Sequence, residues 1–260
     1  MFGRANNRNE KRKKVDRSRP AIPIFRGEKE RIDKYDISKA SPESDFGKAY
    51  YWGLRFIPAR KWATRKGRGR VEWAVFDQEL ANDKSQFDTE YIEDRLKWIN
   101  TILEFYYDEY DGDPDIIVGD MMDGSTSNIL RKYSNLADSM GIPMTEFSNE
   151  IKLQMAEELN PDHFDQQIAI RKEKAFKTVK KIGELEVDKT NIQFPIDPAD
   201  VAAQVADMLM EQDGLQPNEA LELFLTSETF SRLLNDPGIL NLPPDKILEM
   251  YRREVGRHAR

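Results

Sequence analysis

The sequence predicts a mainly α protein with a small β element: an α+β chain of helical hairpins, a C-terminal three-helix unit and an extended basic N-terminal arm. Three observations support this class. Apolar residues recur at helical spacing over most of the chain after residue 87. Period-two alternation is confined to short runs between residues 70 and 120. The first 20 residues carry charge without any hydrophobic period, which is typical of a segment that does not fold alone.

The composition excludes several classes of protein. There is no cysteine, which excludes disulfide scaffolds and zinc sites built from cysteine. No apolar run approaches the roughly 20 residues of a membrane-spanning helix, so we expect no membrane partner. The basic N-terminus has no apolar segment behind it, so we expect no secretory signal. These features predict a chain that works in the cytoplasm or inside a particle.

Charge is divided unevenly along the chain. Residues 1–70 hold 21 Lys and Arg against eight Asp and Glu, a net charge of +13, whereas residues 71–260 hold 19 against 39, a net charge of −20. Such a charge asymmetry indicates which partners the chain can attract, and it does not indicate the fold. The basic part can meet nucleic acid, an acidic protein or the acidic body of another copy, and head-to-tail contacts between copies generate rings or filaments.

Residues 1–45 are expected to form a basic extended arm and connector. Residues 1–20 contain eight basic and two acidic residues, and they can either stay solvated or become ordered on a polyanion. Ile22, Ile24 and Phe25 can dock as a short strand. The punctuating residues of the connector oppose a long element; they are Pro20, Pro23, Gly27 and Pro42.

Residues 46–183 are expected to form an aromatic-rich, mostly helical body. It opens with Phe46–Phe76, which holds three of the four Trp. Arg65–Arg70 forms a predicted glycine turn before the strand Val71–Phe76, and a preceding strand would place its cations at a hairpin tip. Two interpretations stay open: a solvated turn beside an aromatic core, or a surface that holds phosphate through guanidinium groups. We expect the tryptophans to be core and the flanking cations to carry the function.

The rest of this body is expected to be helical apart from a short strand at Ile116–Asp120. A wide apolar stripe predicts a helix over residues 87–107. Helical spacing predicts a pair of helices over residues 125–159. It also predicts a helix over residues 161–182, whose basic end forms a second candidate polyanion surface.

The join of the helical pair resembles a helix-turn-helix motif. Ala137, Gly141 and Phe147 fall at the small, turn and apolar positions of that motif. The would-be recognition helix is acidic, however, and an acidic surface repels DNA. We therefore expect a plain pair of antiparallel helices.

Residues 184–260 are expected to form a C-terminal helical unit that follows an extended boundary. Helix-opening signals recur three times, at Asp197–Pro198, at Pro217 and at the two prolines of residues 243–244. Each signal precedes a short amphipathic stretch. The pattern predicts a small three-helix bundle or interaction module.

The sequence offers no recognisable catalytic or cofactor motif. Only two His are present, and His163 is accompanied by neither a serine-nucleophile motif nor an HExxH zinc motif. A phosphate-binding P-loop and a dinucleotide fingerprint are also absent. We therefore expect no enzyme, no cofactor and no catalytic residue.

Acidic residues between positions 111 and 120 are the strongest metal candidates. Three of them have the one–three–five spacing of a calcium loop, but the sixth position is not glycine and the twelfth is not glutamate. A fourth, Asp120, lies with Asp123 near the end of a predicted strand, where carboxylates can bind Mg²⁺. Without a partner motif we predict no metal at these residues, which are Asp111, Asp113, Asp115 and Asp120.

The leading interpretation is a non-enzymatic structural protein of a larger assembly, such as a virion-like particle. Its basic arm would hold a neighbouring subunit, which can be a copy of itself, or packaged nucleic acid. The alternative is a nucleic-acid-binding regulatory protein that contacts phosphates through residues 4–19 and 60–70, while Tyr51, Trp52 or Trp62 stacks on bases. Both interpretations place the contact on the same basic residues: Arg4, Arg8, Lys11, Arg12, Lys13, Lys14, Arg17, Arg19, Arg60, Lys61, Arg65, Lys66, Arg68 and Arg70.

Overall fold

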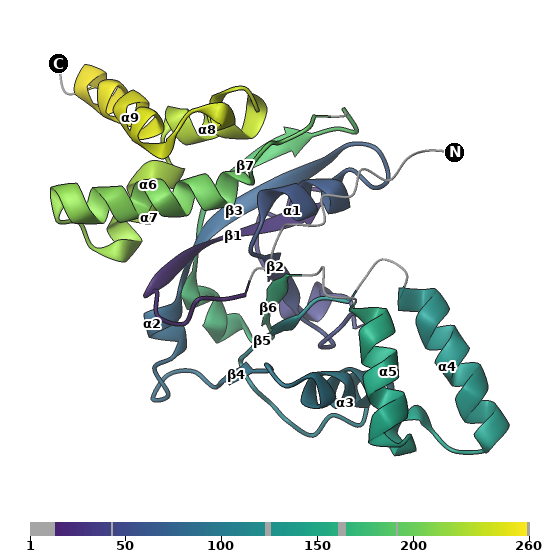
Figure 1. The fold of residues 1–260 in the computed structure, drawn as a ribbon. Helices are drawn as coiled ribbons and strands as arrows, with labels where there is room; N and C mark the ends of the chain where they lie inside the picture. The colour runs from purple at the N-terminus through teal and green to yellow at the C-terminus, as the bar shows by residue number, and fades with distance from the viewer. Residues whose placement is uncertain (1–13, 43, 123–125, 161–164, 191, 259–260) are drawn as a thin grey trace.

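The computed structural model describes residues 14–42, 44–122, 126–160, 165–190 and 192–258. In these residues the central feature is a seven-stranded mixed sheet with the strand order β4–β5–β6–β2–β1–β3–β7. The prediction of a mainly α chain with a small β element is therefore wrong. The protein has an α/β architecture in which a large sheet runs through the molecule (Figure 1).

Neighbouring strands of the sheet are antiparallel, except that β4 and β5 are parallel. The strands are β1 (Ala21–Glu28), β2 (Tyr50–Gly53), β3 (Gly69–Asp77), β4 (Thr89–Tyr91), β5 (Ile116–Asp120), β6 (Gln166–Ile170) and β7 (Val179–Val187). The strands expected at residues 71–76 and 116–120 are therefore present as β3 and β5.

The predicted helix over residues 161–182 is the largest single error. Its described part forms β6, the 3₁₀ helix Glu173–Thr178 and β7. All five residues of β6 are buried, and the strand pairs on both sides, with β2 and β5. A strand without a polar face gives only a short apolar run, and periodicity cannot distinguish such a run from part of a buried helix.

β1 is much longer than the short strand expected from the connector. It pairs with β3 along all eight residues but with β2 only at Phe25. This leaves one side of β1 unpaired at Pro23, which is the situation in which a strand tolerates proline.

The helices occupy the intervals between the strands and most of the C-terminal third. They are α1 (Phe56–Ala63), α2 (Gln78–Ala81), α3 (Arg95–Tyr106), α4 (Thr126–Met140), α5 (Asn149–Leu159), α6 (Pro198–Asp213), α7 (Pro217–Leu225), α8 (Glu228–Asn235) and α9 (Pro244–His258). The helix expected over residues 87–107 begins only at Arg95, because β4 uses residues 89–91. The expected pair of helices at 125–159 is present as α4 and α5.

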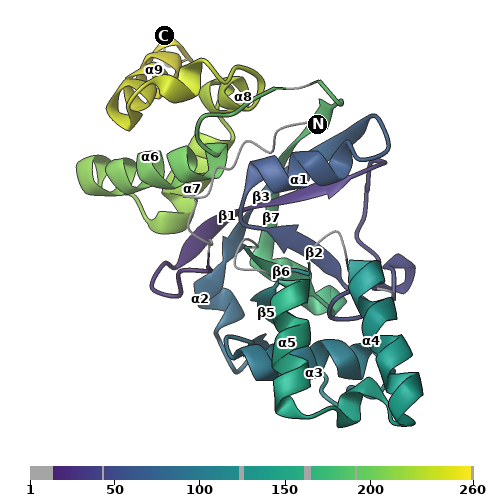
Figure 2. The same cartoon turned by 45° about the vertical axis from the view of Figure 1, so that its right-hand side comes forward.

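Two groups of helices lie at opposite ends of the sheet (Figures 1 and 2). α6–α9 pack with α1 against residues of β1 and β3 such as Phe25 and Trp73. α3–α5 pack against Ile117 of β5 and Ala169 of β6. The other face of the sheet, around the buried Trp52, is covered by short segments that include Val15, α2 and the 3₁₀ helix at 173–178.

The C-terminal unit contains four helices in the described residues rather than the three expected. Residues 217–235 divide at Ser227, whose hydroxyl accepts the N–H of Phe230 and caps α8. β7 continues past residue 183, and the C-terminal helices share one core with β1 and β3. No described helix has the length and apolar character needed to cross a membrane.

Gly27 sets how closely α1 lies on β1. A Cβ at this position would lie 2.0 Å from the carbonyl oxygen of Ala59 and 2.9 Å from the backbone nitrogen of Ala63. Because backbone atoms cannot move aside as a flexible side chain can, Gly27→Ala is expected to lower the free energy of unfolding by about 2–3 kcal/mol. Urea denaturation measures this change. Gly53→Ala is the matched control, since its Cβ would come no nearer than 3.8 Å to Phe25, and an equal loss in the two variants would contradict the prediction.

Candidate polyanion-binding surface

A glycine turn between α1 and β3 presents most of the cations predicted at residues 60–70. Gly67 has a φ of +123°, and a Cβ at Gly69 would lie 2.2 Å from the carbonyl oxygen of Ala63. Both positions therefore require glycine. The element before the turn is a helix and not the strand that a hairpin would need, so Arg65–Arg70 joins α1 to β3 instead of forming the tip of a hairpin.

Two of the predicted cations hold the turn against β7 and the segment after it. Arg60 Nη2 donates to the backbone carbonyl oxygens of Asp188 and Thr190, both at 3.1 Å. Arg70 Nη1 lies 2.7 Å from a carboxylate oxygen of Glu184. These two arginines are therefore occupied in structural contacts.

The other four cations of the turn are exposed to solvent. They have no ion pair with a described residue, and they extend from the last turn of α1 to the residue before β3: Lys61, Arg65, Lys66 and Arg68.

Trp62 lies in the middle of these cations. Its side chain is 58% exposed, and the guanidinium of Arg65 lies 3.9 Å from its ring centroid. The three remaining tryptophans are buried as predicted. The exposed tryptophan and its four cations are called the basic turn below.

The positive field of the basic turn acts on Asp188, at its border. Hydrogen bonds from the hydroxyl and N–H of Thr190 hold the pKa of Asp188 below its usual value, and the charges of Arg60 and Arg68 lower this pKa further. The charges of the two arginines are therefore the smaller cause of this shift, and the hydrogen bonds from Thr190 are the larger.

The described end of the arm packs against its own chain. The N–H of Val15 donates to Gln166 Oε1 at 2.8 Å, and Arg17 forms an ion pair of 3.7 Å with an acid ahead of α3. Arg19 donates two hydrogen bonds to the carboxylate of Asp207 on α6, at 3.0 and 2.6 Å. Two of the predicted contact residues are thus used within the chain.

Lys14 is exposed. The remaining arm residues predicted to make contacts lie outside the described residues: Arg4, Arg8, Lys11, Arg12 and Lys13.

The acidic residues weighed as metal ligands are partly neutralised by lysines of the predicted second basic surface. Asp113 pairs with Lys172 at 2.7 Å, and the buried Asp115 pairs with Lys174 at 2.7 Å. Asp115 also accepts the N–H of Asp88 at 2.8 Å. In the described part of the chain, no three His, Asp or Glu side chains are placed to hold a metal ion.

A buried ionic cluster that the sequence did not indicate lies on β1, β3 and β7. Glu72 is 2% exposed. It accepts the hydroxyl of Tyr35 at 2.7 Å and pairs with Lys181. Arg26 pairs with Glu28 on the same face of β1. The strand register places Arg26 opposite Glu72, so this cluster depends on pairing between segments far apart in the sequence.

Burial gives Glu28 an unusual pKa. Loss of solvation raises the pKa of its carboxyl from 4.5 to about 7; the charge of Arg26 opposes the change, and that of Glu72 adds to it. A carboxyl group that titrates near neutral pH is a feature of functional sites as well as of structural ion networks. Because the hydroxyl of Tyr35 donates to Glu72, the cluster joins the connector to the sheet.

The Glu28 carboxyl predicts a pH dependence of stability. Its pKa is higher in the folded state than in the unfolded state, so the folded protein binds the extra proton and loses stability as pH rises from 4.5 to about 7. This loss is expected to reach about 3 kcal/mol. Urea denaturation across this range should show that the free energy of unfolding of Glu28→Gln increases relative to that of the wild type as pH rises. The same substitution at the exposed Glu30 is the control, and a pH-independent difference at Glu28 would contradict the assignment.

A second polar group joins the connector to the ends of β5 and β6. Asp45 accepts the N–H of Met122 at 2.9 Å and the side-chain amide of Gln167 at 2.6 Å. Loss of solvation raises the pKa of Asp45 despite these hydrogen bonds. Arg55 follows β2 and Asp165 precedes β6. These two residues form a largely buried ion pair of 3.0 Å.

Comparison with known proteins identifies a family for this chain. Neither the curated proteins nor the solved structures contain a match to this chain. A family model covers residues 22–181, which is more than half of the chain and runs from β1 into β7. The matched region includes the basic turn and the ionic cluster, whereas α6–α9 lie beyond it. The chain belongs to the family described as "Protein of unknown function (DUF3990)".

Proposed function

We propose that the chain is a non-enzymatic protein that binds single-stranded nucleic acid through the basic turn. The observation that supports this most strongly is Trp62, a largely exposed indole with the guanidinium of Arg65 at 3.9 Å from its ring. Aromatic rings and arginines serve as stacking platforms for bases, while cations around them contact phosphates.

A single strand fits this surface better than a duplex. Trp62 can stack only on a base whose face is free, and duplex bases are already stacked on each other. No described helix carries the cations along a face that could enter a groove, since they are concentrated at the end of α1 and in the turn after it. Binding of this kind tolerates many sequences, because every base has an aromatic face.

The ordinary structural explanation covers only part of the basic turn. Cations in the last turn of a helix stabilise its dipole, and this accounts for Arg60 and Lys61 of α1. Lys66 and Arg68 lie beyond the helix, next to a glycine with positive φ. They gain nothing from the dipole, and neither forms an ion pair with a described residue, so their exposure supports a contact with an external anion.

Replacement of Trp62 tests the stacking contact. Trp62→Ala is expected to weaken binding of a fluorescent single-stranded oligonucleotide about tenfold, the effect of one lost base stack. Trp62→Phe should restore part of the affinity. The matched control is Tyr106→Ala, which removes an aromatic ring that is 51% exposed on α3. Fluorescence anisotropy at low salt measures all four proteins, and the proposal fails if Trp62→Ala binds like the wild type.

A second candidate function is assembly with other copies of the chain or with other subunits. The contact between Arg19 and Asp207 supports it, because an arginine of the arm is held by two hydrogen bonds on the acidic α6. Size measurements on nuclease-treated protein separate assembly from nucleic-acid binding, since copies that associate through protein contacts stay together without nucleic acid.

A further inference from the structure

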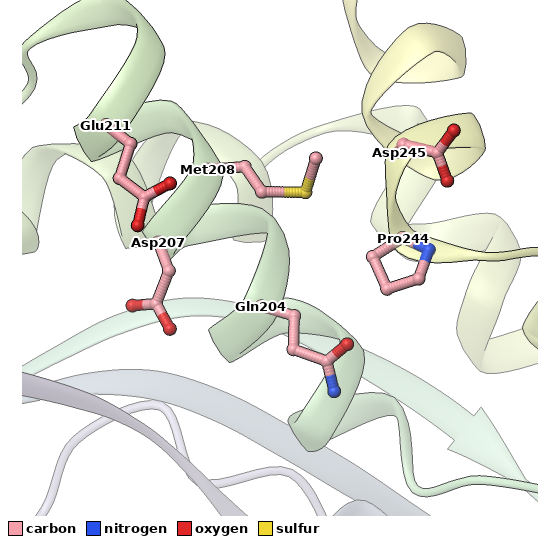
Figure 3. A pocket seen from close by; sticks show the side chains of 6 residues that line it. All are labelled: Gln204, Asp207, Met208, Glu211, Pro244 and Asp245. Atoms are coloured by element: carbon pink, nitrogen blue, oxygen red, sulfur yellow. The ribbon is translucent and has the colours of Figure 1, made fainter.

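A shallow groove of about 400 Å³ lies between α6 and α9. Its lining combines three carboxylates with a polar amide and an apolar floor: Gln204, Asp207, Met208, Glu211, Pro244 and Asp245. Figure 3 shows Met208 extending from α6 toward Pro244 and Asp245 of α9, with Asp207 and Glu211 along the same face of α6. An acidic groove with an apolar floor suits a long basic side chain, which has an apolar stem and a charged end.

The chain already places one arginine at the rim of this groove. Arg19 makes a two-pronged contact with Asp207, which is the fork geometry that carboxylates prefer. Neither Glu211 nor Asp245 forms an ion pair with Lys or Arg among the described residues. The groove therefore keeps two carboxylates available after Arg19 is bound.

We propose that this groove binds the basic N-terminal segment, residues 4–14, of a second copy of the chain. That segment contains six Lys and Arg against the single acid Glu10, so its charge is complementary to the groove. This inference rests on the second candidate function and names the contact that would carry it.

The path of the arm favours a second copy over the same copy. Val15 is held at Gln166, where β6 begins, and Arg19 is held at α6. The described chain thus runs from β6 toward α6 as residue number increases, so Lys14 lies at the β6 end of this path. To reach the groove of the same copy, the segment before Lys14 would have to double back along residues 15–19. A head-to-tail contact avoids this and can continue from copy to copy.

Two complementary variants test the contact in the full-length chain. The groove variant carries Glu211→Gln and Asp245→Asn. The arm variant carries Gln in place of four cations: Arg8, Lys11, Arg12 and Lys13. Sedimentation equilibrium of nuclease-treated protein is expected to show wild-type self-association at about 0.05 M salt that is lost at about 0.5 M. Each variant alone should associate about tenfold more weakly, and an equimolar mixture should form a one-to-one complex.

The mixture is decisive because the groove variant keeps an intact arm and the arm variant keeps an intact groove. The arm of the first can therefore still bind the groove of the second. The control, Glu109→Gln with Asp138→Asn, removes the same number of exposed acids away from the groove and should associate like the wild type. The proposal is overturned by a wild type that is monomeric at low salt, by a groove variant that associates normally, or by a mixture that forms no complex. Oligonucleotide binding by the groove variant should be unchanged, so the two functions fail separately.

Discussion

Neutralising the basic turn is expected to reduce binding of a single-stranded oligonucleotide about 100- to 1,000-fold at low salt. The variant replaces four exposed cations by Gln: Lys61, Arg65, Lys66 and Arg68. Each cation that meets a phosphate releases counterions, so the loss accumulates over the four positions. Fluorescence anisotropy with a labelled oligonucleotide measures the affinity.

The control for this variant carries the same change in net charge elsewhere. It replaces four exposed lysines by Gln: Lys29, Lys34, Lys48 and Lys84. If binding depended only on the overall charge of the protein, the two variants would lose the same affinity. Equal losses would therefore contradict a site at the basic turn, whereas a small loss in the control supports one.

The second large effect is expected at Asp197, which caps two helices at once. One carboxylate oxygen accepts the N–H groups of Phe56 and Ala199, each at 3.0 Å, and the other accepts the N–H of Ile57 at 2.9 Å. The side chain therefore joins the start of α1 to the start of α6, and it is 3% exposed. Asp197→Ala would leave these buried donors without an acceptor.

The expected cost of Asp197→Ala is about 3 kcal/mol in the free energy of unfolding, which combines two lost helix caps with buried unpaired donors. Asp197→Asn keeps one acceptor oxygen and should lose about half as much. Asp138→Ala, at an exposed acid of α4, is the control and should change stability by less than about 0.5 kcal/mol. Urea denaturation measures all three. A loss below about 1 kcal/mol in Asp197→Ala would show that the double cap contributes little.

Local signals predicted the C-terminal part of the chain well. Asp197 and Pro198 open α6, and Gly214 closes it with a φ of +69°. Pro217 opens α7, and Pro244 opens α9. Capping and termination depend on a few adjacent residues, so a single sequence is enough to locate them. The division at Ser227 was missed because the apolar residues of α7 and α8 continue one helical stripe.

The sheet could not be predicted in the same way. β1, β3 and β7 pair across long distances in the sequence, and β6 is buried by two neighbouring strands. Pairing of this kind is a tertiary effect that local propensity does not report. The prediction therefore treated the apolar run around Ile168 as one side of a helix.

The sequence predicted the cations of the candidate site but not their arrangement in space. The clustering of Lys and Arg near residues 60–70 indicated a charged surface. Only the structure shows that Arg60 and Arg70 are occupied by contacts with the end of β7 while four neighbours remain exposed. The expectation that the tryptophans are core is wrong for Trp62, which is 58% exposed, whereas the alternative interpretation names Trp62 among the aromatic residues that stack on bases.

The salt dependence of oligonucleotide binding by the wild-type chain tests the central claim most directly. A single strand held by four cations should give a plot of log affinity against log salt concentration with a slope of about −3. The slope should approach zero in the variant that lacks the four cations of the basic turn. Absence of binding at low salt, or binding that does not change with salt, would contradict the claim that the basic turn grips nucleic acid.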